Sequence, residues 1–236
     1  MKQKLATIPA SARTPPPAAA IDLGLTAHES VYRELREQIL VGAFRPGSAI
    51  TLRGIAETLG VSPMPIREAV RRLIAERALE MQGNRRVLVP PMTPLKFQQI
   101  VFARLALEPE LAMRALSNIS RANIATIASI DARVDQSMAE GDVEGYMRGN
   151  YRFHFTIYEL AGAEMLLGLV ESTWLQFGPF MRMAYGRIGT STLEDHHQAA
   201  IAALRKGDAR ALKAAISADI GQGMGFIGKA VLQHES

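Results

Sequence analysis

The sequence of 236 residues contains no cysteine. Disulfide bonds are therefore excluded, and so is a zinc site built from thiolates. The sequence also lacks any apolar run near the roughly 20 residues that a helix needs to cross a bilayer, and its first residues lack the apolar centre of a signal peptide. These absences lead us to expect a protein of the cytoplasm that makes no contact with a membrane.

Net charge is low as well. The formal charge is +4 at pH 7, which permits contact with nucleic acid but does not demand it. The positions of the basic residues are more informative than their number, because arginines gather between Arg53 and Arg86 within one compact motif.

That motif runs from Leu52 to Val89. Apolar residues recur at helical spacing up to Leu59, Gly60 permits a sharp turn, and Ser62 can cap a second helix. The second helix should begin near Pro65, because proline suits the first turn of a helix. A helix, a tight turn, a second helix and a β-hairpin are the pattern of a winged helix-turn-helix.

The arginines of this motif lie where DNA would be contacted. The second helix can turn Arg67, Arg71 and Arg72 outward, and its N-terminal end would enter a major groove. A turn at Gly83 joins two short strands, and Arg85 and Arg86 follow it at a tip suited to phosphates or to a minor groove. The alternative is a small helical subdomain whose arginines only keep its surface solvated.

The rest of the chain divides into a tail and a helical region. Residues 1–27 combine prolines and alanines with little periodicity, which predicts a flexible tail. A DNA-binding domain should span residues 28–91, and an all-helical bundle should span residues 92–236. We expect the bundle helices at about 95–117, 121–140, 143–161, 164–186, 191–206 and 208–232. The predicted fold class is mainly α, with one small β-hairpin.

Polar residues occupy positions that helical periodicity assigns to the interior of this bundle. Asn150 and His154 lie one turn apart on an apolar face, and His197 and Asp219 lie on apolar faces of later helices. Burying an ionisable group without a partner is costly, so each of these residues needs a neighbour, a metal or a ligand. If the helices converge, this set suits a divalent transition metal.

Simpler interpretations stay open for these residues. A histidine on an apolar helix face is more often a hydrogen-bonded core residue than a metal ligand. Arg104 and Glu108 could form an ordinary ion pair between successive turns of one helix. Tyr146, Trp174 and Tyr185 could line a pocket or simply belong to the core.

Several motifs resemble a known family. Residues 31–91, with Phe-Arg-Pro-Gly, Leu-Gly-Val-Ser and Pro-Ile-Arg-Glu-Ala, resemble the DNA-binding domain of GntR-family bacterial transcription regulators. Residues 93–232 resemble the all-helical FCD effector domain of the FadR subfamily, through the spacing of Arg104 and Glu108 and the motif that ends at His154. The residues expected to approach DNA are Arg53, Ser62, Met64, Pro65, Arg67, Arg71, Arg85 and Arg86.

The resemblance also implies a metal site. Many FCD domains bind a metal through an aspartate and three histidines. Here Asn150 stands at the position of the aspartate, His154 and His197 match two histidines, and Asp219 stands at the last. One carboxylate remains in the set, so the ligand charge is unchanged. We expect a divalent metal, zinc first, with nickel or manganese as alternatives.

The same resemblance implies an effector site beside the metal. Arg104 stands where FCD domains commonly anchor the carboxylate of a small organic acid, and we expect Glu108, Tyr146, Trp174 and Tyr185 to complete this site. The predicted function is that of a homodimeric regulator, with repression as the first expectation, whose binding to operator DNA responds to a small carboxylic acid. A constitutive regulator with a degenerate effector site is the alternative. A metal-dependent hydrolase is disfavoured, because Glu108 is the only candidate base and is better explained as the partner of Arg104.

Overall fold

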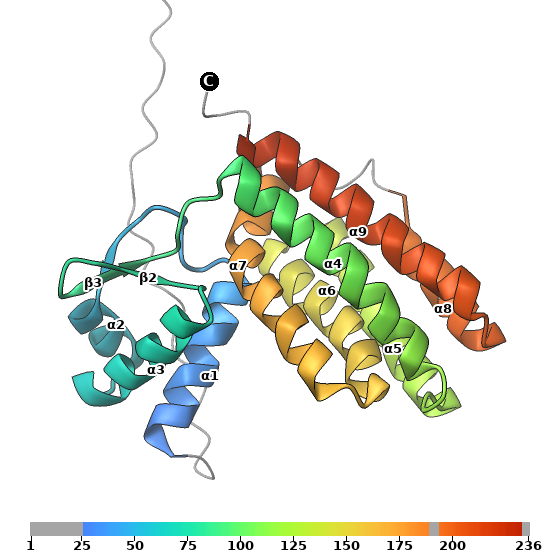
Figure 1. The fold of residues 1–236 in the computed structure, drawn as a ribbon, viewed down its shortest axis with the longest axis horizontal. Coiled ribbons are helices and arrows are strands. Elements are labelled where there is room, and N and C mark those ends of the chain that lie inside the picture. Colours follow the sequence, from blue (N-terminus) through green and yellow to red (C-terminus); the bar gives the residue numbers. More distant parts are fainter. Residues whose placement is uncertain (1–25, 189–193, 233–236) are drawn as a thin grey trace, which may run out of the picture.

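The protein is described by a computed structural model that covers residues 26–188 and 194–232 (Figure 1). Residues 1–25 of the expected tail lie outside the described part. The elements are α1 (Ala27–Leu40), β1 (Ile50–Thr51), α2 (Leu52–Leu59), α3 (Pro63–Ala75), β2 (Glu80–Gln82), β3 (Arg86–Leu88), α4 (Pro94–Ala115), α5 (Arg121–Glu140), α6 (Val143–Tyr158), the 3-10 turn η1 (Glu159–Ala161), α7 (Glu164–Ile188), α8 (His196–Lys206) and α9 (Ala209–Leu232).

The N-terminal unit is a winged helix-turn-helix. Helix α2 ends at Gly60, whose φ of 64° is the left-handed conformation that glycine adopts at little cost. Helix α3 begins at Pro63, two residues before the position that the sequence suggested. Ser62 precedes it with extended backbone, but its side chain makes no capping hydrogen bond. The reason is local, because Pro65 has no backbone N–H at a position from which a cap usually draws one.

The wing is part of a sheet with strand order β1-β3-β2. Strands β2 and β3 form the expected antiparallel hairpin, with Gln82 opposite Arg86. Strand β1 adds a short third strand, with Ile50 opposite Val87. The sequence did not predict β1, because two extended residues directly before a helix leave no periodic signal.

The C-terminal unit is a bundle of the remaining helices (Figure 1). Helix α4 packs against α9, α5 against α6, and α8 against α9. The bounds of α5 match the prediction, because Ser120 forms a capping box with Asn123 and Gly141 ends the helix with a φ of 69°. Helix α8 begins later than predicted, at His196, where Asp195 accepts a hydrogen bond from the Gln198 N–H at 3.0 Å. Among the described residues, no helix is both long and apolar enough to cross a membrane.

The two units meet where α1 lies against α7 (Figure 1). Gly178 allows this approach, because a Cβ atom there would lie 2.8 Å from the carbonyl oxygen of Leu40. Arg182 donates a hydrogen bond to the carbonyl of Val41 at 3.0 Å, and Arg36 pairs with Glu171 at 3.0 Å. The end of the first helix is therefore fixed directly to the bundle.

Candidate metal centre and neighbouring cavity

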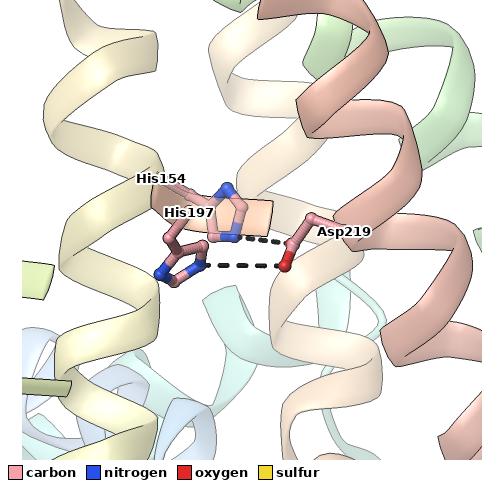
Figure 2. Close-up of side chains that lie close together, drawn as sticks. All are labelled: His154, His197 and Asp219. Carbon is pink, nitrogen blue, oxygen red and sulfur yellow. Dashed lines mark ion pairs between the residues drawn. The ribbon is translucent and has the colours of Figure 1, made fainter. Parts of the chain in front are cut away.

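Three helices bring His154, His197 and Asp219 together inside the bundle. Each residue offers one ligand atom, and these atoms all lie within 4.8 Å of one another. Figure 2 shows both imidazole rings directed at Asp219, whose carboxylate oxygens lie 3.1 Å from His154 Nε2 and 3.8 Å from His197 Nε2. The helices α6, α8 and α9 thus converge as the apolar-face positions of these residues led us to expect.

The outer nitrogen of His197 is held by a carboxylate. Its Nδ1 lies 2.7 Å from Asp131 Oδ1, and Asp131 Oδ2 accepts a hydrogen bond from the Gln198 amide at 2.6 Å. Asp131 is buried, and an ionised carboxylate can only accept. His197 therefore carries its proton on Nδ1.

The outer nitrogen of His154 is held through a hydroxyl. His154 Nδ1 lies 3.0 Å from the Tyr158 oxygen, and Tyr158 donates its only hydroxyl proton to Glu108 Oε2 at 2.9 Å. The proton between His154 and Tyr158 must then come from the imidazole. His154 therefore also carries its proton on Nδ1.

This proton arrangement leaves both Nε2 atoms as acceptors when the rings are neutral. Each would then direct a lone pair at the Asp219 carboxylate, which is itself an acceptor. A cation between them relieves this conflict, either a proton on the rings or a metal ion. Two imidazole nitrogens with outer partners and one carboxylate form a donor set that fits a divalent transition metal.

The charges around the site favour its ionised forms without a metal. Burial alone would raise the pKa of Asp219, but the hydrogen bond to His154 and the charges of His154, His197 and Arg104 lower it to about 2. Burial would lower the pKa of His197, but its bond to Asp131 and the charge of Asp219 raise it. In the metal-free protein, these neighbours favour the protonated form of His197.

Asn150 lies one turn before His154 on α6 and lines a cavity that adjoins the triad of His154, His197 and Asp219. Its residue exposure is 7%, and its side chain makes no hydrogen bond within the described part of the chain. A buried amide normally has a partner. Asn150 thus has a free oxygen and a free amino group at the cavity, available to an ion, a water molecule or a ligand.

Arg104 is supported from behind by a fully buried carboxylate. Its Nε donates to Glu108 Oε1 at 2.5 Å and its Nη2 donates to Glu108 Oε2 at 3.2 Å. Trp174 Nε1 donates to Glu108 Oε1 at 3.1 Å. The guanidinium also lies over the rings of Trp174 and Phe177, at 4.6 and 4.1 Å from their centroids. This cage fixes the orientation of Arg104.

A cavity of about 100 Å³ adjoins the triad, and its lining includes Arg104, Tyr146 and Tyr185. The two tyrosine rings pack edge to face with centroids 4.6 Å apart. Burial raises the pKa of Tyr185 to about 12 and that of Tyr146 well above its usual value, so both hydroxyls keep their protons. Glu108 and Trp174, expected to touch an effector, lie behind Arg104 and do not contribute to this lining.

Sequence reasoning missed two residues of the site, Asp131 and Tyr158. A signal existed for each. Asp131 follows Ile130 and precedes Val134 by three residues on the apolar face of α5, and Tyr158 lies one turn after His154. Acids and hydroxyls that share a buried face with a histidine are candidates for its outer partner.

The side chains expected to approach DNA come from α2, the turn before α3, α3 itself and the wing. Met64 is 65% exposed, unusual for a large apolar side chain. Arg53 pairs with Glu57 and Arg71 with Glu68, each at 2.8 Å. Within the described ranges, Arg67 makes no ion pair. The exposed residues of the set are Arg53, Ser62, Met64, Arg67, Arg71, Arg85 and Arg86, whereas Pro65 is half-buried.

Comparison with known families gives two matches. Residues 27–89 match the family described as bacterial regulatory proteins, gntR family. Residues 99–222 match the family described as FCD domain. The two matches coincide with the winged unit and with most of the bundle.

Individual relatives and solved structures agree with these matches. The chain is 28% identical over 166 residues to the HTH-type transcriptional regulator McbR of Escherichia coli (strain K12), covering 70% of this chain and 75% of the relative. It is 20% identical over 191 residues to the HTH-type transcriptional repressor RspR of the same strain, covering 80% and 84%. The solved structure of E. coli McbR/YncC superposes with a TM-score of 0.82 at 24% identity, covering 87% of this chain and 98% of that one. A putative GntR regulator from Rhodococcus sp. RHA1 gives a TM-score of 0.68 at 21% identity, covering 86% and 98%. These structural likenesses show a shared fold.

Proposed function

This chain belongs to the GntR family of bacterial regulatory proteins and carries an FCD domain, and from that premise we propose that it is a metal-containing, homodimeric repressor controlled by a small organic acid. Membership of the family makes it a DNA-binding transcription regulator and not an enzyme. A regulator that binds chromosomal DNA works in the cytoplasm. The observation that carries the rest of the proposal is the pair of Nε2 atoms that face the Asp219 carboxylate.

The metal would be held by His154, His197 and Asp219, with the oxygen of Asn150 as a further ligand. The support is that both outer imidazole nitrogens already have acceptors, which is how metal-binding histidines are usually oriented. Zinc is the first candidate, with nickel or manganese as alternatives, since imidazole and carboxylate ligands suit all three. When bound, the metal supplies a Lewis acid to which a carboxylate oxygen can bind.

The effector would enter the cavity and place its carboxylate near Arg104. Glu108 accepts hydrogen bonds from Nε and Nη2 of Arg104. Within the described part of the chain, Nη1 donates only to the weak acceptor Met224 Sδ, at 3.3 Å. N–H groups on the cavity side are therefore available to an anion. Because Glu108 and the rings around it fix the guanidinium, a carboxylate bound there would be oriented as well as attracted.

A ligand in the cavity could affect DNA binding through α6 and α7. Both helices contribute residues to the cavity, and both contact α1 of the winged unit. On α7, Tyr185 lines the cavity and Arg182 holds the end of α1 at Val41. An effector regulates only if it binds one arrangement of the two units more tightly than another.

The proposed DNA face is tested most directly at Arg67. We expect Arg67→Ala to weaken operator binding by about tenfold or more, because a base or phosphate contact of arginine contributes about 1–3 kcal/mol. The measurement is a titration of labelled operator DNA at constant salt. Arg114→Ala, an exposed arginine on α4, is the control and should leave the affinity unchanged. Equal affinities of the Arg67 variant and the wild type would show that α3 is not the recognition helix.

The homodimer is proposed to form at the outer face of α4. Leu95, Phe102 and Leu105 form one stripe along this helix, with exposures of 65%, 76% and 38%. An exposed apolar stripe of this kind often marks an interface.

We expect Phe102→Glu to convert the dimer to a monomer, because the new carboxylate would be buried without a partner. Sedimentation velocity measures the change in mass. Met165→Glu on α7, where the side chain is also exposed, is the matched control. A dimer that survives the α4 substitution and dissociates with the α7 substitution would place the interface at α7.

A further inference from the structure

The cavity beside the triad is lined by several carboxylate residues, although the proposed function assigns it an anionic ligand. Among the described residues that line it, Arg104 is the only cationic side chain apart from the histidines. Five carboxylate residues contribute to its lining: Asp131, Asp135, Glu194, Asp195 and Asp219.

The positive charges near the cavity do not offset these carboxylates. The charge of Arg104 is already balanced by Glu108, which accepts two of its hydrogen bonds. A divalent ion at the triad would balance only two of the five acids. A simple carboxylate or dicarboxylate entering the cavity would therefore meet a surplus of negative charge, which opposes its binding.

The acids differ in how they are used. Asp131 holds His197, Asp195 caps α8 at the Gln198 N–H, and Asp219 faces the imidazoles. Within the described residues, the side chains of Asp135 and Glu194 make no hydrogen bond or ion pair, and both are exposed. The carboxylates of Asp135 and Glu194 are therefore available to bind a ligand.

The crowding of the acids has a physical consequence. The pKa of Asp135 is raised by partial burial and by the nearby charges of Asp131 and Asp195. A cation placed beside Asp135 would relieve the repulsion among these three carboxylates.

A second feature is a polar group that opens onto the cavity. Asn150 lines it with a residue exposure of 7% and makes no side-chain hydrogen bond among the described residues; because no fully buried side-chain nitrogen or oxygen there lacks a partner, its amide must face the cavity space. The hydroxyls of Tyr146 and Tyr185 keep their protons at neutral pH and add further polar groups at its wall. A cavity of about 100 Å³ is far smaller than the roughly 300–1,000 Å³ of sites for drug-sized ligands, so the ligand is small.

We propose that the effector is a small amino acid or amino carboxylate, whose carboxylate binds at Arg104 and whose protonated amine binds at Asp135 and Glu194. This inference rests on the proposed function and narrows its class of effector. The lining then offers a partner for each charge, and the surplus of acid serves to select ligands that carry an amine over acids that lack one.

The test compares ligands that share a carbon skeleton and differ in the amine. The pairs are butyrate with 4-aminobutyrate, propionate with alanine, and succinate with aspartate, each titrated calorimetrically into the full-length, metal-loaded protein. We expect the amine-bearing member of at least one pair to bind about tenfold more tightly than its partner, as one close charge pair near a protein surface allows. This advantage should shrink in high salt, because the acids at the mouth are exposed.

Variants show whether the acids cause the preference. The double substitution Asp135→Asn with Glu194→Gln should abolish it, whereas Glu140→Gln at the exposed end of α5 should leave it unchanged. Equal or tighter binding of the acids without an amine, no binding by any of the six ligands, or a preference that persists in the double variant would overturn the inference.

Two further measurements on the same preparations, operator affinity and metal content, distinguish a failure of this inference from a failure of the proposed function. If metal is retained and acids without an amine change operator affinity, the choice of amino carboxylates is wrong and the proposed function stands. If neither metal nor any acid changes operator affinity, the proposed control by an organic acid fails too, and a constitutive regulator remains.

Discussion

Replacing Glu108 by alanine is expected to lower the free energy of unfolding by about 3–5 kcal/mol, because removing one partner of a buried ion pair leaves the other charge buried and unpaired. The exposure of Arg104 is only 4% and that of Glu108 is 0%. The substitution also removes the acceptor of the Tyr158 hydroxyl and of the Trp174 indole N–H. Each of these buried donors adds to the cost when it is left without a partner.

Equilibrium unfolding in urea measures this loss, and the same helix supplies a matched control. Glu110 lies two residues further along α4 and pairs with Arg114 at 2.7 Å, with both side chains partly exposed. Glu110→Ala should cost no more than about 1 kcal/mol, the usual range for surface pairs. Similar losses for the two variants would mean that Glu108 does not hold a buried, charged Arg104 in solution.

The second large effect concerns the metal. We expect the purified protein to contain close to one divalent metal ion per chain, and the double variant His154→Ala with His197→Ala to contain almost none. Two imidazole ligands are lost at once, and the remaining Asp219 carboxylate is a weak site by itself. Elemental analysis of the untagged protein measures the metal directly.

Two further variants sharpen this measurement. Asp131→Asn should weaken metal binding by about 10- to 100-fold, as the loss of an outer partner of a ligating histidine usually does. His196→Ala is the control, because this adjacent imidazole lies 3.4 Å from the Gln222 amide and is not part of the triad. Equal metal contents in all variants would place the ion elsewhere. No metal in any of them would mean that protonated histidines pair with Asp219, and that an effector is held without a metal.

The overall architecture could be predicted because its signals are local. Three glycines end elements where the sequence predicted the ends: Gly60 after α2, Gly83 after β2 and Gly141 after α5. Each of these signals depends only on a few neighbouring residues. The predicted fold class, mainly α with a winged helix-turn-helix and an FCD bundle, is confirmed. Strand β1 escaped notice because it is defined by its pairing with β3, which the sequence does not display.

The site could be predicted only in part, for a related reason. Periodicity places His154, His197 and Asp219 on buried faces, and these three residues do meet. Periodicity does not predict which helices pack against each other. The hydrogen bond between Asp131 of α5 and His197 could therefore not be predicted. The same limit explains why Trp174, expected at the effector site, lies behind Arg104 and not at the cavity.

The close approach of Leu40 to Gly178 limits how this protein could be re-engineered. Sensors for new metabolites are often built by joining one DNA-reading module to a foreign ligand-binding module. A foreign bundle that carried any side chain at the position of Gly178 would push its Cβ atom to within 2.8 Å of the Leu40 carbonyl, and backbone there cannot yield as a flexible side chain would. A functional chimera would therefore need a glycine at the position of Gly178 wherever the end of α1 is kept. The contact between α1 and α7 would have to be transferred as a whole.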